Sequence, residues 1–279
     1  MAIQRTSVPD LQEMKRLGDK ITLLTAYDCL LAGLIDEAQI DLILIGDSVG
    51  MVVLGYESTV PVTLEQMVHH TQAVVSTAHR PLIIADMPFG SFEPSDEEAI
   101  RSAQHLVKVG GAQAVKVEGG NDLVRRRIGA IVQAGVPVMS HLGLTPQTTT
   151  MLGGYRVQGR EASAAQQILD HARSLQAEGI FSLLLECVPA EVARAVTAEL
   201  HVPVIGIGAG AECDGQALVT QDLLGLYPAL PRHARQFAQL RSTISEALAE
   251  FRSEVKAQRF PAEENTFHMK AQEAAKFSR

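Results

Sequence analysis

Charged side chains stand at the ends of several short apolar segments in this sequence. Asp47, Asp86 and Glu118 follow three successive segments of this kind, and Lys116 lies two positions before Glu118. Carboxylate oxygens with no histidine or cysteine cluster beside them are hard ligands that suit Mg²⁺ or a similar divalent ion. We therefore predict a divalent metal site formed by Asp47, Asp86 and Glu118, with the ammonium group of Lys116 in the same small volume.

Two later apolar segments also end in polar residues that could act on a proton. Glu186 is separated in sequence from the predicted metal ligands, which makes it the candidate for a general base. His141 would lie near Glu186 and act as a proton donor or as a group that polarises the substrate. A buried histidine with satisfied hydrogen bonds is an equally simple interpretation of His141 alone.

A carboxylate that follows a strand does not have to bind a metal. Asp28 precedes a predicted helix, and we expect its side chain to cap that helix. Asp47, Asp86 and Glu118 could each be a cap or a loop residue if they are considered singly. Their recurrence after three successive strands is what favours the metal site.

Alternating strands and helices would position these residues. Short β-branched apolar runs predict strands buried on both faces, which we place at Ile21–Ala26, Asp41–Ile45, Pro81–Ala85, Ala114–Val117, Val136–Ser140, Ile180–Leu185, Val202–Ile207 and, more weakly, Ala217–Thr220. The segments between the strands have helical periodicity, and an amphipathic helix follows the last strand with an apolar face made by Phe237, Leu240, Ile244, Leu248, Phe251 and Val255. This alternation predicts an α/β fold, a (β/α)8 TIM barrel, whose chemistry takes place at the C-terminal ends of the strands. An open, doubly wound sheet is the alternative.

The alternation of side chains along a strand predicts which residues reach the barrel interior. On this basis each acid should continue an inward-facing row. The rows that we predict are Ile43, Ile45 and Asp47; Leu82, Ile84 and Asp86; and Ser182, Leu184 and Glu186.

Length and composition limit the class of protein. We expect a single domain over residues 1–279, with a flanking segment at about 1–18 and a polar tail at about 256–279. A net charge of −8 and one basic cluster, Arg125–Arg127, without interleaved aromatic residues argue against nucleic-acid binding. Three widely spaced cysteines argue against a disulfide framework and a zinc site, and they favour the reducing cytoplasm. Neither a signal sequence nor a membrane span is expected.

Two glycine-rich segments leave alternatives open. Gly206–Gly210 follows the seventh predicted strand, where many barrels bind phosphate through backbone N–H groups, so a phosphate-ester substrate is a rival hypothesis. Tight turns after strands also use glycine. Gly153, Gly154 and Gly159 lie in a long loop that either closes over the barrel mouth or is a surface excursion.

The residues at these strand ends belong to longer motifs. The motifs are Gly46-Asp-Ser-Val-Gly-Met51, Ala85-Asp-Met-Pro-Phe-Gly90, Val115-Lys-Val-Glu-Gly-Gly120, His141-Leu-Gly-Leu-Thr-Pro-Gln147, Leu185-Glu-Cys-Val-Pro189 and Gly206-Ile-Gly-Ala-Gly210 with Asp214-Gly-Gln216. In this order, over nearly the whole chain, they resemble the 3-methyl-2-oxobutanoate hydroxymethyltransferases, also called ketopantoate hydroxymethyltransferases.

The resemblance implies a barrel of the phosphoenolpyruvate mutase and isocitrate lyase type and a reaction of pantothenate biosynthesis. A hydroxymethyl group from 5,10-methylenetetrahydrofolate would be added to C3 of 3-methyl-2-oxobutanoate. By motif position, Mg²⁺ would be held by Asp47, Asp86 and Glu118; the oxo acid would be contacted by Asp47, Ser48, Asp86 and Lys116; and Glu186 would accept the proton. The family forms homo-oligomers, commonly decamers, which sets the same expectation here.

Two other classes of function stay open at this stage. A metal-dependent aldolase or lyase of the same barrel group is one, although the related lyases rely on a cysteine in a basic, glycine-flanked motif that this sequence lacks. A ligand-binding barrel without catalysis is the other. The segment Leu230–Phe237 departs from the family pattern, in which phenylalanine and valine commonly take the places of His233 and Ala234.

Overall fold

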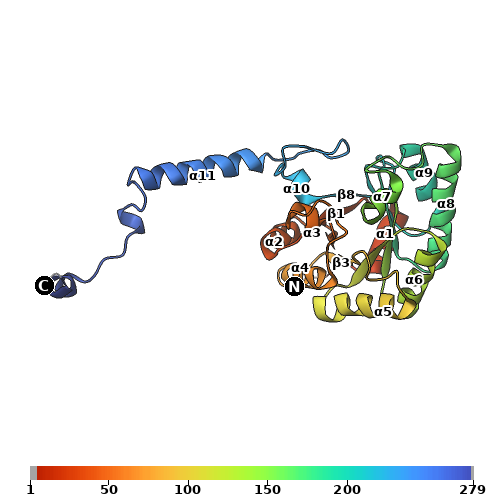
Figure 1. Cartoon of the computed structure of the whole chain (residues 1–279), viewed down its shortest axis with the longest axis horizontal. Helices are drawn as coiled ribbons and strands as arrows, with labels where there is room; N and C mark the ends of the chain where they lie inside the picture. The colour runs from red at the N-terminus through yellow and green to blue at the C-terminus, as the bar shows by residue number, and fades with distance from the viewer. Residues whose placement is uncertain (1–4, 278–279) are drawn as a thin grey trace. The chain divides into compact units, whose positions relative to one another are not determined.

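Eight parallel strands close into a barrel in the computed structural model, which describes residues 5–277 (Figure 1). Each strand pairs with the next along the chain, and β1 pairs with β8, so the barrel is confirmed and the open sheet is excluded. The strands are β1 (Ile21–Thr25), β2 (Leu42–Ile45), β3 (Leu82–Asp86), β4 (Ala114–Glu118), β5 (Val138–Gly143), β6 (Ser182–Glu186), β7 (Val204–Ile207) and β8 (Gly215–Leu218).

Helices follow most of the strands, as right-handed crossovers between parallel strands require. The α-helices are α1 (Val8–Leu17), α2 (Cys29–Glu37), α3 (Val49–Val52), α4 (Leu64–Val75), α5 (Asp96–His105), α6 (Asp122–Gln133), α7 (Thr149–Leu152), α8 (Ala162–Ala177), α9 (Ala190–Glu199), α10 (Thr220–Leu223), α11 (Leu240–Lys256) and α12 (Ala271–Phe277). A π-helical turn, η1 (Leu106–Gly110), extends α5, and two 3₁₀ turns are η2 (Pro146–Thr148) and η3 (Glu263–Asn265).

Two apolar clusters separate the inside of the barrel from its outside. Strand residues such as Ile43 and Val115 pack outward against helix residues such as Met67. Leu42 and Ile84 belong to the interior cluster, and Leu11 of α1 packs with them. Because Leu11 contacts residues of the interior, α1 covers the end of the barrel at which the strands begin.

The predicted cap on the helix after β1 is confirmed. The Asp28 carboxylate accepts hydrogen bonds from the backbone N–H groups of Leu30 and Leu31, both at 2.9 Å. Asp28 is therefore occupied in starting α2, as an N-cap residue should be.

The chain divides into two compact units. One contains the barrel and runs to Gln221 with the addition of Pro231–Ala234, and the other contains Asp222–Leu230 and the residues from Arg235 onward. In the second unit α11 has no buried residue, and its apolar side chains, Ile244, Leu248, Phe251 and Val255, are exposed. The expectation of one domain over residues 1–279 stays a prediction.

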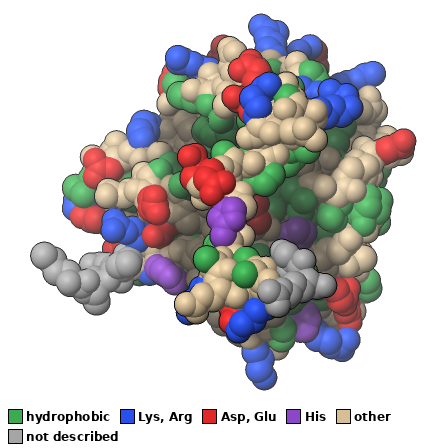
Figure 2. All heavy atoms as spheres, turned by 90° about the vertical axis from the view of Figure 1, so that its left-hand side faces the viewer, with side chains coloured by type: hydrophobic (Ala, Val, Ile, Leu, Met, Phe, Trp, Pro, Cys, Tyr) green, Lys and Arg blue, Asp and Glu red, His purple; other side chains and the backbone are tan. Residues whose placement is uncertain are grey.

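The surface carries charges of both signs. Lysine and arginine side chains lie among aspartate and glutamate side chains on the face drawn in Figure 2. Among the described residues, no helix is long and apolar enough to cross a membrane.

Candidate active site

Strand pairing brings the predicted site residues next to one another. In the register of the sheet, Asp86 of β3 is the partner of Lys116 of β4, and Glu118 of β4 is the partner of His141 of β5. Glu186 ends β6 beside Gly143 of β5. The side chains therefore converge at the C-terminal end of the barrel, as expected for this fold.

For the second strand we predicted that Ile43, Ile45 and Asp47 share the inward face, and this prediction is wrong. Ile43 and Ile45 pack outward against the helices, whereas Leu42 and Leu44 face the interior. Asp47 reaches the site because β2 ends at Ile45 and the chain turns at Gly46, where a Cβ atom would lie 2.7 Å from Ser48 Oγ. After the turn, the backbone N–H of Asp47 donates to Asp86 Oδ2 at 3.1 Å.

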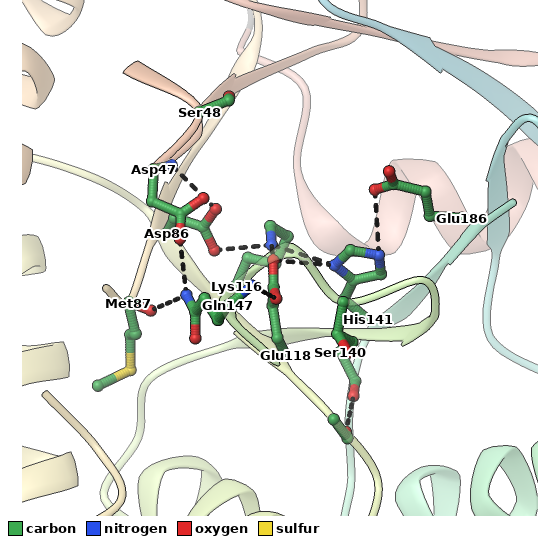
Figure 3. Close-up of polar contacts among 12 residues, drawn as sticks. Asp47, Ser48, Asp86, Met87, Lys116, Glu118, Ser140, His141, Gln147 and Glu186 are labelled. Carbon is green, nitrogen blue, oxygen red and sulfur yellow. Dashed lines mark hydrogen bonds and ion pairs between the residues drawn. The ribbon is translucent and has the colours of Figure 1, made fainter. Parts of the chain in front are cut away.

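The three predicted metal ligands form one buried cluster. Asp47, Asp86 and Glu118 each offer a carboxylate oxygen, and these oxygens all lie within 4.8 Å of one another. Lys116 Nζ lies 2.8 Å from Asp86 Oδ1 and 3.2 Å from Glu118 Oε1 (Figure 3). Each of these residues is at most 5% exposed, so water screens their charges very little.

The three carboxylates of this cluster share one ammonium group, that of Lys116, which cannot balance three negative charges. Burial, followed by repulsion from Asp86 and Glu118, raises the pKa of Asp47 well above its usual value. Burial also raises the pKa of Asp86, against the attraction of Lys116. Glu118 is different, because Lys116 and His141 outweigh the effect of burial and lower its pKa to about 2. A buried oxygen cluster with an excess of negative charge fits a divalent cation such as Mg²⁺.

His141 connects the carboxylate cluster to Glu186. Its Nδ1 lies 3.3 Å from Glu118 Oε1, and its Nε2 lies 3.4 Å from Glu186 Oε2. Figure 3 shows Glu186 on the opposite side of His141 from Asp47 and Asp86. Burial and the Lys116 ammonium favour the neutral ring, but the two glutamates outweigh them and raise the pKa of His141 to about 9.

Ser48 lies at the edge of this network. Its hydroxyl group is 2.8 Å from the Tyr27 hydroxyl, and the Tyr27 side chain is buried. Burial raises the pKa of Tyr27, so this phenol stays protonated and can donate to Ser48. The sequence prediction included Ser48 but missed Tyr27. Tyr27 directly follows the first predicted strand, and nothing in its local sequence indicates that its hydroxyl group contacts Ser48.

Gln147 is a second residue that the sequence prediction left without a role. Its side chain donates to Asp47 Oδ2 at 2.9 Å, although the two residues are 100 positions apart. No local pattern predicts such a contact. The only signal was its place at the end of the motif that begins at His141.

The glycine-rich segment after β7 has a steric reason for its composition. Gly208 has a positive φ of +65°, and a Cβ atom there would lie 3.0 Å from the His233 side chain.

In the long loop after β5, the Tyr155 hydroxyl donates to Met51 Sδ at 3.4 Å. Burial, followed by the negative charges of Glu186, Asp47 and Glu118, raises the pKa of Tyr155.

Solved structures with the same architecture share little sequence with this chain. A 2,3-dimethylmalate lyase, described as a member of the PEP mutase/isocitrate lyase superfamily, aligns with a TM-score of 0.57 and 16% identity over 98% of both chains. A phosphonopyruvate hydrolase, solved in complex with oxalate and Mg²⁺, aligns with a TM-score of 0.61 and 12% identity over 97% of this chain and 94% of that one. These similarities show that the barrel fold is shared with these proteins.

Sequence similarity extends over the whole barrel. A protein named 3-methyl-2-oxobutanoate hydroxymethyltransferase from Heliobacterium modesticaldum is 50% identical over 95% of this chain and 96% of its own length. One of the same name from Moorella thermoacetica is 51% identical over 94% of this chain and 98% of its own length. Residues 5–263 match the family model described as ketopantoate hydroxymethyltransferase. The chain therefore belongs to the ketopantoate hydroxymethyltransferase family.

Proposed function

We propose that this protein transfers a hydroxymethyl group from 5,10-methylenetetrahydrofolate to C3 of 3-methyl-2-oxobutanoate, which gives ketopantoate in pantothenate biosynthesis. Membership of the family and the names of the relatives support this reaction. The observation that carries it is the position of Glu186, a candidate base joined through His141 to a buried cluster of three carboxylates.

We assign Asp47, Asp86 and Glu118 to a Mg²⁺ ion or a similar divalent ion. Their oxygen-only donor set and excess negative charge fit such an ion. When bound, the ion would polarise the keto oxygen of a 2-oxo acid and make the C–H bond at C3 more acidic. Asp47 and Asp86 would also contact the oxo acid, together with Ser48 and Lys116.

The remaining side chains would divide the work of proton removal. Glu186 would take the C3 proton, and the electrons of that bond would move towards the keto oxygen. Lys116 is held beside the site by Asp86 and Glu118, so its ammonium group can stabilise the negative charge that develops there. Ser48, by its hydroxyl or its backbone, would fix the carboxylate end of the substrate, and Tyr27 would orient the Ser48 hydroxyl.

The nucleophilic C3 would then form a bond to the methylene carbon of the folate, while one of the two C–N bonds of that carbon breaks and its nitrogen takes up a proton. The methylene group carries no oxygen, so water must then supply the new hydroxyl group. Its oxygen would bond to the methylene carbon as the second C–N bond breaks, its proton would go to that nitrogen, and tetrahydrofolate would leave. Water has to be kept away from C3 until then, since it would return a proton to that carbon. The loop around Tyr155 is our candidate for this exclusion, because Tyr155 contacts Met51 at the same end of the barrel.

His141 would keep Glu186 in place, and the charge on the His141 ring would influence the charge on Glu186. It bridges Glu118 and Glu186, and with its pKa at about 9 the ring carries a proton at neutral pH. A protonated ring can donate to both glutamates at once. His141 would therefore orient the base in the free enzyme and could return a proton later in the reaction.

We further propose that the protein is a cytoplasmic homo-oligomer, a decamer as in the family. The three cysteines are free, which suits a reducing compartment. The exposed apolar face of α11 offers a surface that another subunit could cover.

Formation of ketopantoate by the purified chain tests this proposal. With 3-methyl-2-oxobutanoate, 5,10-methylenetetrahydrofolate and Mg²⁺, we expect ketopantoate to appear, and we expect none without the folate or after chelation of the metal. Turnover of 2-oxo acids without folate would instead indicate a lyase or aldolase. Binding of the oxo acid without any reaction would indicate a non-catalytic barrel.

A further inference from the structure

Gln147 contacts two of the proposed metal ligands, and the proposed reaction does not use these contacts. Its Nε2 atom donates to Asp47 Oδ2 and to the backbone carbonyl of Met87, both at 2.9 Å. Its backbone N–H donates to Glu118 Oε2 at 3.1 Å. One residue of η2 therefore ties together the ends of β2, β3 and β4 (Figure 3).

The chemistry of these contacts fixes the orientation of the amide. Both partners of the side chain are oxygen acceptors, and an amide offers two N–H donors on its nitrogen and only lone pairs on its oxygen. A flipped amide would place its oxygen against two other acceptors. Because the Gln147 side chain is only 5% exposed, neither of its donors has water as a ready alternative.

Asp47 is held differently from the other two ligands. Asp86 and Glu118 lie on strands and each pairs with Lys116, whereas Asp47 comes from the turn beyond β2. Within the part of the chain that the structure describes, Gln147 supplies the one hydrogen bond donated to the Asp47 carboxylate. A neutral amide can orient this carboxylate without adding a positive charge that would compete with a cation.

We propose that Gln147 is the positioning residue of the metal site: it holds Asp47 and Glu118 in the arrangement that binds a divalent ion. This inference rests on the proposed metal site. Its backbone is suited to the task, because Pro146 restricts the first residue of η2 and the hydroxyl groups of Thr145 and Thr148 meet at 2.6 Å across the turn. The site is thereby organised before the ion arrives.

Calorimetric titration of the metal-free full chain with Mg²⁺, in the absence of substrates, tests the role of Gln147. Gln147→Met has a similar length but no donor, and we expect it to bind Mg²⁺ roughly 10- to 100-fold more weakly, the usual result of losing a hydrogen-bond partner of a metal ligand. Gln72→Met is the matched control, since the same substitution removes an amide donor to the Val109 carbonyl at 3.0 Å on α4 and touches no carboxylate of the cluster. This control should bind Mg²⁺ like the wild type.

Activity at rising Mg²⁺ separates positioning from a direct part in the reaction. If Gln147 acts through the ligands, Gln147→Met should need more Mg²⁺ but recover its rate near saturation. If that variant does not fold by circular dichroism, Gln147→Asn takes its place, because it keeps a polar amide in the buried turn but draws the amide nitrogen back from Asp47 by one methylene group.

Two results would overturn the inference: Mg²⁺ affinity in the folded variant equal to that of the wild type, or a rate that stays low at saturating Mg²⁺. A wild type that binds no divalent ion would remove the metal site and this role with it. A wild type that binds Mg²⁺ but forms no ketopantoate would refute the proposed function alone, and the affinity comparison would still decide the role of Gln147.

Discussion

Asp86 links several parts of the site. It accepts the backbone N–H of Asp47, pairs with Lys116 at 2.8 Å, and lies in the cluster of proposed metal ligands. Asp86 is the last residue of β3, so the barrel itself fixes its position. A change at this residue should therefore affect the ion and the substrate together.

Replacement of Asp86 by asparagine tests that link. Asp86→Asn keeps the shape of the side chain but removes a negative charge, so we expect Mg²⁺ and 3-methyl-2-oxobutanoate each to bind more weakly, by at least the roughly 10- to 100-fold that follows loss of a partner of a ligand. Titration calorimetry with each ligand measures this. Asp122→Asn, on the fully exposed side chain at the start of α6, is the control. Loss of oxo acid binding alone would remove Asp86 from the metal site.

At the scale of the elements, most of the barrel could be predicted from the sequence. Each of the eight strands was expected within a few residues of its place, because runs of β-branched residues bounded by polar turns are a strong local signal. The row through Ile43 and Ile45 failed because alternation holds only within a strand, and β2 ends before Asp47. The contact of Gln147 with Asp47 joins distant segments, which local patterns do not reveal.

The turn that ends β5 should be intolerant of a side chain. Gly143 has a φ of +95°, and a Cβ atom there would lie 2.2 Å from the Glu186 carbonyl oxygen. Gly143→Ala should destabilise the protein by more than the roughly 1–3 kcal/mol of backbone strain alone, and it should displace Glu186. Gly135 has a φ of +88° but open space around it, so Gly135→Ala measures the strain without the collision. Equal losses of unfolding free energy in the two variants would show that the collision is relieved.

Helices α5 and α6 are joined by an ion pair whose effect should depend on pH. The Arg127 side chain is buried and pairs with Asp96, and this contact, followed by others with Arg126, lowers the pKa of Asp96. A lowered folded pKa contributes stability at pH values above the unfolded pKa, and this contribution is lost as the pH falls through the folded value. Asp96→Asn should therefore unfold at lower denaturant concentration than the wild type at neutral pH.

The same comparison in acid completes the test of the ion pair. As the pH falls below about 4, where aspartate takes up a proton even in the unfolded chain, the difference between Asp96→Asn and the wild type should shrink. Urea unfolding at several pH values measures both effects. A difference that does not change with pH would mean that the charge of Asp96 contributes nothing.

At the scale of the whole molecule, α11 indicates assembly. Its apolar residues at 244, 248, 251 and 255 follow helical spacing and are exposed in the single chain. Light scattering should therefore give a multiple of the chain mass of 30.0 kDa, ten copies in a decamer. Leu248→Glu should lower this mass, whereas Ser253→Glu, which by helical spacing lies on the opposite side of the helix, should not. A monomer mass for the wild type at micromolar concentration would contradict the proposed assembly.

The central claim is that Glu186 removes the C3 proton of a 2-oxo acid bound beside the carboxylate cluster. The most direct measurement is exchange of the C3 hydrogen of 3-methyl-2-oxobutanoate with deuterated water, followed by NMR without folate. We predict exchange by the wild type that requires Mg²⁺, and a loss of rate on the order of 10²–10⁴ in Glu186→Gln, which keeps the shape of the side chain but not its basicity. Binding of Mg²⁺ and oxo acid should survive in that variant. Exchange by Glu186→Gln at the wild-type rate would contradict the account and make His141 the next candidate for the base.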